Sequence, residues 1–414
     1  MKHLPGAMAI LVMAAACSPT PPNVRLATFN VSLNRPRAGQ LVADLSGGHD
    51  SQARRVAAIV QSVRPDILLL NEFDHDSAGE AAGLFNDLYL AVPQGDGGGN
   101  GSGDGQHAPT PRPPAAGLRY PYWFTASVNT GVPSGTDLDR DGVVDTEPGS
   151  RGYGGDALGF GVFPGQYGMV VYSRFPIVER EVRTFQNFLW RDMPGASLPT
   201  DPDSGDPWYG PDQLAVLPLS SKSHWDVPVR IAGRVVHLLV SHPTPPVFDG
   251  PEDRNGRRNH DEIRFWRDYV TPDSGGYIYD DHGVGGGLEP GARFVIMGDQ
   301  NSDPNDGDSF GWPIDMLLDS PAIDASTVPR SSGGAEAARL QGEANEGQQG
   351  DPAFDTGDFP DAGGGPGNLR LDYVLPSRGF RLLGSGVFWP PSADPAHTLI
   401  GASDHRLVWL DLTW

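Results

Sequence analysis

The chain is poor in cysteine and in positive charge. Cys17 is its only cysteine, so no disulfide can form within the chain. Lys and Arg number 30 against 52 Asp and Glu, which gives a formal net charge of −22. Because proteins that hold nucleic acid through its phosphates normally present Lys and Arg, we expect no stable nucleic-acid partner. We expect a monomer that stays soluble outside the cell.

The N-terminal apolar run is too short to span a bilayer comfortably. It lies within residues 1–17, after Lys2 and before Cys17, which is the arrangement of a signal peptide. Residues 14–17 resemble the lipobox of bacterial lipoproteins, with Ala14 where Leu, Val or Ile is more usual. We expect acylation of Cys17 and export, as a cell-envelope lipoprotein (outer membrane or periplasmic face) or a secreted protein. The lipid anchor would be the only membrane contact; a secretory signal with an unrelated cysteine is the alternative.

Glycine and proline are abundant, at 55 and 40 residues, whereas apolar residues make up a modest 38%. This composition indicates a globular core that carries long irregular insertions. We expect one domain over residues 23–414, with insertions at about 94–160 and at 331–367. Gln94–Gly117 is rich in Gly and Pro, and Ser331–Gly367 in Gly, Ala and acidic residues. Both predict surface loops or disordered segments, which could cover an active-site mouth.

The other segments alternate between strand-like and helical patterns. Strands are predicted at Val24–Val31, Ile67–Leu70, Gly168–Tyr172, Val235–Ser241, Phe294–Met297, Leu371–Leu375 and Leu407–Leu412. Helices are predicted at Ser51–Val63 and Asp261–Tyr269. Buried strands mixed with helices predict an α/β fold in which two mixed β-sheets pack face to face between helices, a four-layer sandwich.

Several of the predicted strands carry polar residues at their ends. These residues are Asn30, Asn71-Glu72, Ser241-His242, Gly298-Asp299-Gln300-Asn301, Asp372 and Asp404-His405. Carboxylates and amides supply the oxygen ligands that Mg²⁺ prefers, and histidine can move protons near neutral pH. Each residue alone could be a turn, a cap or a loop residue. The order of the whole set is much harder to obtain by chance.

The segments around these residues resemble the endonuclease/exonuclease/phosphatase superfamily of DNase I-like proteins, which includes nucleases, inositol polyphosphate phosphatases and bacterial sphingomyelinases. The matching segments are residues 26–30 (LATFN), 65–72 (PDILLLNE), 172–177 (YSRFPI), 241–242 (SH), 298–301 (GDQN), 370–373 (RLDY) and 403–405 (SDH). They cover nearly the whole mature chain and are specific for the superfamily, not for a substrate. The resemblance implies a DNase I-like fold and a metal-dependent phosphoric ester hydrolase.

The resemblance also implies a metal site and a proton-transfer pair. Glu72 would be the principal ligand of Mg²⁺ or Mn²⁺, with Asn30 and Asp404 close to the same ion. His405, oriented by Asp372, would activate the attacking water or steady the pentacovalent phosphorus. A carboxylate beside an imidazole raises its basicity and fixes its tautomer.

Further site residues would contact the water and the phosphate. The resemblance implies that Asp299 and Asn301 position the nucleophilic water and the scissile phosphate. His242 would protonate the leaving oxygen or hold a nonbridging oxygen. Gln300 departs from the family pattern, in which many relatives have Phe, and this puts nearby substrate contacts in doubt.

A second patch, Ser220–Trp225, contains Lys222 and His224. Both could neutralise a phosphate in an otherwise acidic protein, which makes them candidate substrate-binding residues. The alternative is an exposed loop before a strand near Val227–Ile231.

Residues 137–147 follow the spacing of a calcium-binding loop, with acidic oxygens at the first, third and fifth positions and glycine at the sixth. We expect structural Ca²⁺ held by Asp137, Asp139, Asp141, Val143 and Asp145. The twelfth position is Pro148, so the bidentate Glu of an EF-hand is missing, and Glu147 or Asp145 would have to compensate. A solvated acidic turn is the alternative.

The sequence therefore predicts an extracellular metal-dependent phosphatase or phosphodiesterase that acts on small phosphate esters or lipid headgroups. The second hypothesis is an extracellular DNase-like endonuclease, which needs a basic face. Arginines that could supply one are Arg254, Arg257, Arg258 and Arg264. A noncatalytic surface binding protein would predict loss of Glu72, Asp299 or His405, and none of them is lost.

Overall fold

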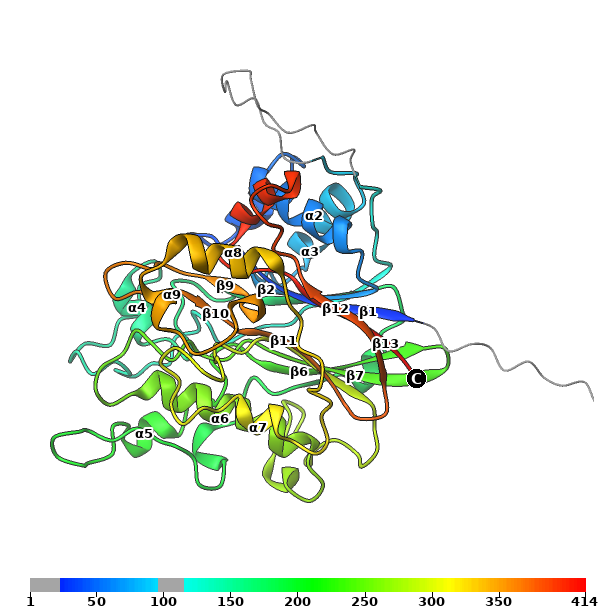
Figure 1. Ribbon diagram of the computed structural model, residues 1–414. Helices are drawn as coiled ribbons and strands as arrows, with labels where there is room; N and C mark the ends of the chain where they lie inside the picture. The colour runs from blue at the N-terminus through cyan, green and yellow to red at the C-terminus, as the bar shows by residue number, and fades with distance from the viewer. Residues whose placement is uncertain (1–22, 96–114) are drawn as a thin grey trace, which may run out of the picture.

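The computed structural model describes residues 23–95 and 115–414 (Figure 1). The expected signal segment with Cys17 and most of the Gln94–Gly117 stretch lie outside the described residues. No described helix is both long enough and apolar enough to cross a membrane.

Two large sheets lie at the centre of the molecule (Figure 1). The first sheet has the strand order β12-β13-β1-β2-β4-β3. Its strands are β1 (Val24–Leu33), β2 (Ile67–Phe73), β3 (Tyr122–Phe124), β4 (Met169–Ser173), β12 (Arg381–Val387) and β13 (Val408–Thr413). β1 and β2 are parallel, whereas the other neighbours are antiparallel. The runs of Val, Ile and Leu in β1 and β2 fit strands that are covered on both faces.

The second sheet has the strand order β11-β8-β7-β6-β5. Its strands are β5 (Arg183–Thr184), β6 (His224–Ile231), β7 (Arg234–Ser241), β8 (Phe294–Asp299) and β11 (Asp372–Pro376). β7 and β8 are parallel, and the chain between them forms helix α6 (Arg254–Val270). Parallel neighbours need such a crossover, and α6 extends further toward the N-terminus than the predicted Asp261–Tyr269.

Three apolar cores hold four layers together. The central core lies between the sheets and joins side chains such as Leu69 and Val240. The second core packs β1 and β2 against helices α1 (Gln40–Leu45), α2 (Ser51–Val63) and α3 (Glu80–Phe85), and the third packs β8 against α6. In Figure 1 these helices lie on the outer faces of the two sheets. The expected four-layer α/β sandwich is confirmed.

The segment Ser331–Gly367 is ordered, which corrects the expectation of an irregular or disordered insertion. It forms α8 (Ser332–Gln341), α9 (Ala344–Gly347), β9 (Gly357–Asp358) and, just beyond it, β10 (Asn368–Leu369). Ser331 caps α8 by accepting a hydrogen bond from the Gly334 N–H. A side-chain carbon at Gly333 would lie 2.2 Å from the carbonyl oxygen of Trp389. The glycines that made this segment look like a surface loop or a disordered segment in the sequence therefore allow close packing of α8.

The remaining described elements are short. They are α4 (Arg151–Gly155), α5 (Pro211–Leu214), α7 (Asp315–Leu318), a π-helical turn (Asn86–Leu90) and 3₁₀ turns at Glu179–Glu181, Trp190–Asp192, Gly275–Tyr277, Pro352–Phe354 and Pro395–Ala402. Of these, α4 and the loops around it form one wall of the cavity described below.

Candidate active site

The polar residues at the strand ends converge at one edge of the two sheets. Asn30 on β1 and Glu72 on β2 come from parallel neighbours of the first sheet. Asp299 at the end of β8 pairs with Asp372 at the start of β11 in the second sheet. The Asn30 amide donates a hydrogen bond to each of Glu72 and Asp299, at 3.0 Å in both cases. This amide therefore links the two sheets within the site.

Asp299 contacts both histidines of the site. Its Oδ2 lies 3.4 Å from Nε2 of His242 and 3.5 Å from Nε2 of His405. Burial by itself raises the pKa of this carboxyl group. The charge of His405, the hydrogen bond and charge of His242 and the Asn30 amide outweigh burial, and they hold the pKa of Asp299 well below its usual range. Asp299 is therefore ionised at neutral pH.

His405 is held by Asp372, not by its neighbour Asp404. Its Nδ1 lies 2.8 Å from Asp372 Oδ2, which also accepts a hydrogen bond from the Thr356 hydroxyl at 2.8 Å. Burial opposes the charged imidazolium, but Asp372 and Asp299 raise the pKa of His405 above its ordinary value. Burial raises the pKa of Asp372, although His405 opposes that change. Both side chains are buried, so water has little access to the pair.

The more open side of the site carries Glu72 and Asp404. Glu72 adopts left-handed backbone angles (φ 57°), and Ser32 does the same (φ 48°). Such angles are costly for residues other than glycine and are often found at functional sites. Asp404 is exposed, and its Oδ1 accepts a hydrogen bond from the Ser32 hydroxyl at 2.9 Å. Within the described chain, the second carboxylate oxygen of Glu72 and of Asp404 has no hydrogen-bond donor, so both residues fit a hard cation.

Asp299, Asp372 and His405 form another group that could hold a metal, since their ligand atoms lie within 4.8 Å of one another. Those atoms already contact each other at 2.8 and 3.5 Å. A cation among them would have to separate His405 from Asp372. The open oxygens of Glu72 and Asp404 are therefore the better metal ligands, and the buried group is better suited to holding protons.

Asn301 and Gln300 follow Asp299 and point in different directions. Asn301 has a φ of 50°, its N–H donates to Asp299 Oδ1 at 2.9 Å, and its side-chain amide donates to the carbonyl oxygen of Pro243 at 3.0 Å. Gln300 is fully buried, and its amide lies 3.4 Å from the Ser241 hydroxyl. Gln300 thus lies beneath the site and is not part of the cavity lining.

The segment Ser220–Trp225 is buried, so it is not the exposed loop that was the alternative. Lys222 lines the cavity beside Glu72 and His242, with Nζ 3.5 Å from the carbonyl oxygen of Pro243. Burial lowers the pKa of Lys222, although nearby carboxylates such as Glu262 and Glu72 oppose the change. Apart from Lys2 it is the only lysine of the chain, a signal that was already present in the sequence.

His224 does not lie with Lys222, which corrects its expected role as a phosphate ligand. Its Nδ1 lies 3.1 Å from the Ser220 hydroxyl, and its Nε2 lies 2.9 Å from the carbonyl oxygen of Glu262. Burial lowers the pKa of His224 to about 4, so the ring is neutral near pH 7. Both nitrogens are occupied, and the residue stabilises the junction of β6 with α6.

The acidic loop brings together only part of the predicted calcium ligands. Asp137 and Asp139 lie with Asp156, and this group could hold a metal. Asp156 was missed because it lies outside the loop spacing; its carboxylate accepts hydrogen bonds from the Leu138 and Asp145 N–H groups, at 2.8 and 2.7 Å. Of the expected carboxylate ligands, Asp141 and Asp145 lie outside this group. Asp141, for example, accepts a hydrogen bond from the Val143 N–H at 2.8 Å.

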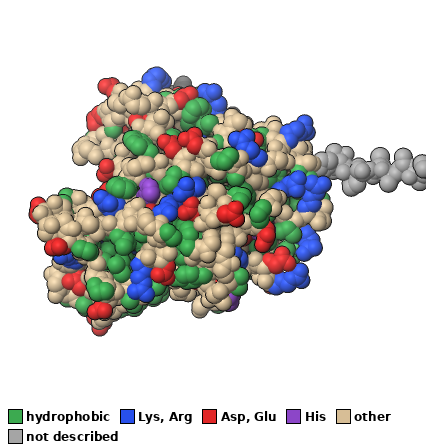
Figure 2. Space-filling model, turned by 90° about the horizontal axis from the view of Figure 1, so that it is seen from below, with side chains coloured by type: hydrophobic (Ala, Val, Ile, Leu, Met, Phe, Trp, Pro, Cys, Tyr) green, Lys and Arg blue, Asp and Glu red, His purple; other side chains and the backbone are tan. Residues whose placement is uncertain are grey.

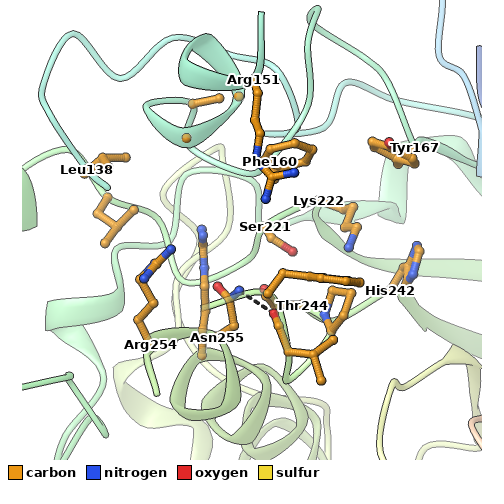
Figure 3. Close-up of a pocket in the computed structure, with 18 of the residues that line it drawn as sticks. Leu138, Arg151, Phe160, Tyr167, Ser221, Lys222, His242, Thr244, Arg254 and Asn255 are labelled. Atoms are coloured by element: carbon orange, nitrogen blue, oxygen red, sulfur yellow. Dashed lines mark hydrogen bonds between the residues drawn. The ribbon is translucent and has the colours of Figure 1, made fainter. Parts of the chain in front are cut away.

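A cavity of about 440 Å³ opens beside Glu72 and His242 of the strand-end site (Figure 3). Glu72, His242 and Lys222 line one end, the catalytic end, and several further lining residues are ones that sequence reasoning missed. The missed residues include Arg151, Phe160, Tyr167, Tyr209 and Phe248. They lie on loops and on α4, where no periodic pattern marks them, and only the fold brings them beside the strand ends.

Comparisons with known proteins place this geometry in context. A family model described as "Endonuclease/Exonuclease/phosphatase family" matches residues 27–405. Comparison with curated proteins gave no match.

Three solved structures illustrate the likeness in fold. An endonuclease/exonuclease/phosphatase from Beutenbergia cavernae DSM 12333 is 16% identical with a TM-score of 0.48, and the match covers 94% of this chain and 71% of that chain. A family protein from Leptotrichia buccalis C-1013-b is 11% identical, with a TM-score of 0.47 and coverage of 94% and 100%. Sphingomyelinase C from Streptomyces griseocarneus is 14% identical, with a TM-score of 0.41 and coverage of 94% and 99%.

Proposed function

Because the chain belongs to the endonuclease/exonuclease/phosphatase family, whose members are generally phosphoesterases and nucleases, we propose that it is an extracellular, metal-dependent hydrolase of phosphate esters. The observation that carries this proposal is the position of Asp299. It lies between His242 and His405 and is linked through Asn30 to Glu72. Glu72 and His242 in turn line the end of the cavity that also contains Lys222. Negative, positive and proton-carrying groups therefore surround one place where a phosphate fits.

Glu72 and Asp404 would hold the cation, with Mg²⁺ or Mn²⁺ as the expected ion. When bound, it would supply positive charge to the phosphate oxygens. The Asn30 amide donates to Glu72 in the structure, so Asn30 would have to turn its amide oxygen toward the cation to join the ligands.

The buried residues would act on the water and on the phosphate. Ionised Asp299 can accept a hydrogen bond from the attacking water and orient it. Protonated His405, held by Asp372, can donate from Nε2 to a phosphate oxygen and oppose the charge that develops there. His242 can donate from Nε2 to the leaving oxygen, and Lys222 adds positive charge at the same end of the cavity.

The endonuclease alternative needs arginines that are free to contact DNA. Within the described residues, Arg258 donates to three carbonyl oxygens, Arg264 pairs with Asp268, and Arg254 pairs with Glu252. Arg257 packs over the ring of Phe310. Because most of these cations are already occupied, a small ester fits the site better than a DNA duplex.

Three further expectations remain part of the proposal. The chain would be exported and anchored through acylated Cys17, and it would work as a monomer. Ca²⁺ would bind at the acidic loop, through the carboxylates of Asp137, Asp139 and Asp156 that the fold brings together.

A substrate panel tests the proposed function. The purified protein would be assayed with Mg²⁺, Mn²⁺ or Ca²⁺ on a bis-aryl phosphodiester, an aryl phosphomonoester and plasmid DNA. We expect metal-dependent hydrolysis of at least one small ester, and chelation should abolish it. Efficient cleavage of plasmid alone would favour the endonuclease, and no hydrolysis with any metal would refute both enzymatic hypotheses.

A further inference from the structure

The cavity has a charge balance opposite to that of the chain. Its lining includes the cationic residues Arg151, Lys222, Arg254 and Arg258, whereas Glu72 is the only carboxylate in the lining. The whole chain has 52 acidic and 30 basic residues. On the face drawn in Figure 2, Lys and Arg side chains lie beside hydrophobic ones near a histidine. A cavity of this composition favours an anionic ligand with an apolar part.

Three of the four cations already have partners. Arg258 is partly buried and donates to the carbonyl oxygens of Leu219, Leu158 and Pro218. Arg254 forms an ion pair with Glu252. Lys222 belongs to the catalytic end, next to Glu72 and His242. These three side chains therefore shape the cavity or serve the scissile phosphate.

Arg151 differs from them. Its side chain is exposed and extends from α4 into the cavity beside Phe160 (Figure 3). Throughout residues 23–95 and 115–414, no hydrogen-bond acceptor or carboxylate pairs with its guanidinium group. An arginine without a partner can offer a planar set of donors to a phosphate or a carboxylate.

The helix that carries Arg151 is held in place. The Ser150 hydroxyl accepts a hydrogen bond from the Tyr153 N–H at 3.0 Å, and the Tyr153 hydroxyl donates to the Gly131 carbonyl at 2.6 Å. A side-chain carbon at Gly155 would lie 2.0 Å from Asp139 Oδ2, so this turn packs directly against the acidic loop. The position of Arg151 is thus set by the fold.

Exposed apolar side chains also line the cavity. Phe248 is 80% exposed and Phe160 is 49% exposed, and both are part of the lining. Exposed aromatic rings at a cavity mouth provide contact area for an apolar or aromatic part of a ligand.

We propose that the cavity binds a phosphate ester that carries a second anionic group, separated from the scissile phosphate by an apolar or aromatic segment, and that Arg151 binds this second group. The inference rests on the proposed function because it takes the Glu72 and His242 end as the place of the scissile phosphate. Arg151 is then a specificity-determining residue that lies on an insertion, apart from the reacting atoms.

Calorimetric binding of simple probes tests this inference without turnover. Hexyl phosphate would be compared with ethanediol, hexanediol and decanediol bisphosphates, and with a hexyl phosphate that ends in a carboxylate, all at fixed Mg²⁺ and Ca²⁺. We expect at least one doubly anionic probe to bind about tenfold more tightly than hexyl phosphate, the order expected for a charge-assisted contact. The spacer that binds best reports the separation of the two anion sites, and the carboxylate probe shows which anion is preferred.

Substitutions test whether Arg151 is the residue responsible for the preference for doubly anionic probes. Arg151→Gln should abolish the tenfold preference and leave the binding of hexyl phosphate unchanged, whereas Arg151→Lys should retain part of it. Arg230→Gln is the matched control, since Arg230 is exposed near the far end of β6 and outside the cavity lining; it should retain the full preference.

The outcomes separate this inference from the proposed function. Equal binding of all probes by the unmodified protein, or a preference that survives Arg151→Gln, would overturn the role of Arg151. A preference that depends on Arg151, in a protein that hydrolyses no ester of the substrate panel, would support the anion site and overturn the proposed function.

Discussion

The catalytic end of the cavity and the rest of its lining are built in different ways. At the catalytic end, His242 lines the cavity and contacts the buried Asp299, which also contacts the buried His405, and all three lie at or next to strand ends. Elsewhere in the lining, Arg151 and Phe248 are exposed and lie on a short helix and a loop. The comparison indicates that the strand ends hold the reacting groups, while the insertions decide which ester reaches them.

The difference has an energetic consequence. A buried network tolerates the loss of one member poorly, because the remaining charge is left without its partner. An exposed arginine without a partner contributes little to folding, so its removal should change binding alone. Substitutions at the catalytic end and in the rest of the lining should therefore separate catalysis, stability and selectivity.

The largest effect is expected for His405→Ala. The variant removes the protonated ring that contacts Asp372 and Asp299, and we expect turnover of the best ester to fall by about a thousandfold or more. The protein should remain folded by circular dichroism but unfold at a lower temperature, because buried Asp372 and Asp299 lose their charged partner. His49→Ala, which alters an exposed histidine, is the control and should keep full activity. Wild-type turnover by His405→Ala would show that the site is assigned wrongly.

A smaller effect is expected for Lys222→Met, at the catalytic end of the cavity. The substitution keeps the length of the buried side chain and removes its charge, so kcat/KM should fall by about ten- to a hundredfold. The midpoint of thermal unfolding should be unchanged or higher, because burying a charge is costly. Arg230→Met removes one charge outside the cavity and serves as the control. Unchanged kcat/KM for Lys222→Met would mean that Lys222 does not contact the phosphate.

The smallest effect is expected at the acidic loop beside α4. Ca²⁺ should raise the midpoint of thermal unfolding by about 1 °C, the shift that ~1 kcal/mol produces in a chain of this size. The measurement would use Glu72→Gln, to reduce binding at the catalytic site, with and without Asp139→Asn. The calcium-induced shift should disappear in the double variant. A melt that is indifferent to EDTA in Glu72→Gln would contradict the calcium site.

The fold was predictable to a large extent from local patterns. The predicted strands and helices are present. Most segments that resemble the family carry polar residues that meet at the catalytic end, but residues 172–177 do not, because Ser173 pairs with Ile67 at the start of β2. The prediction of a loop or disordered segment at Ser331–Gly367 was wrong, because its Gly-rich part forms the packed helix α8, in which Gly333 lies against Trp389. The predicted role of His224 was also wrong, since nothing in the order of residues shows that both ring nitrogens meet partners from Ser220 and Glu262.

By itself, the sequence determined the four-layer architecture, because hydrophobic periodicity is a local property of the chain, and its resemblance to the family pointed to the polar strand-end residues that the structure brings together. The resemblance already implied that Asp372 orients His405, and the structure shows this contact at 2.8 Å. Only the tertiary structure decided that Asp156 joins Asp137 and Asp139, and that Arg151 faces the same cavity as Glu72. These are contacts between segments far apart in the sequence, and packing of the two sheets and their insertions brings them together.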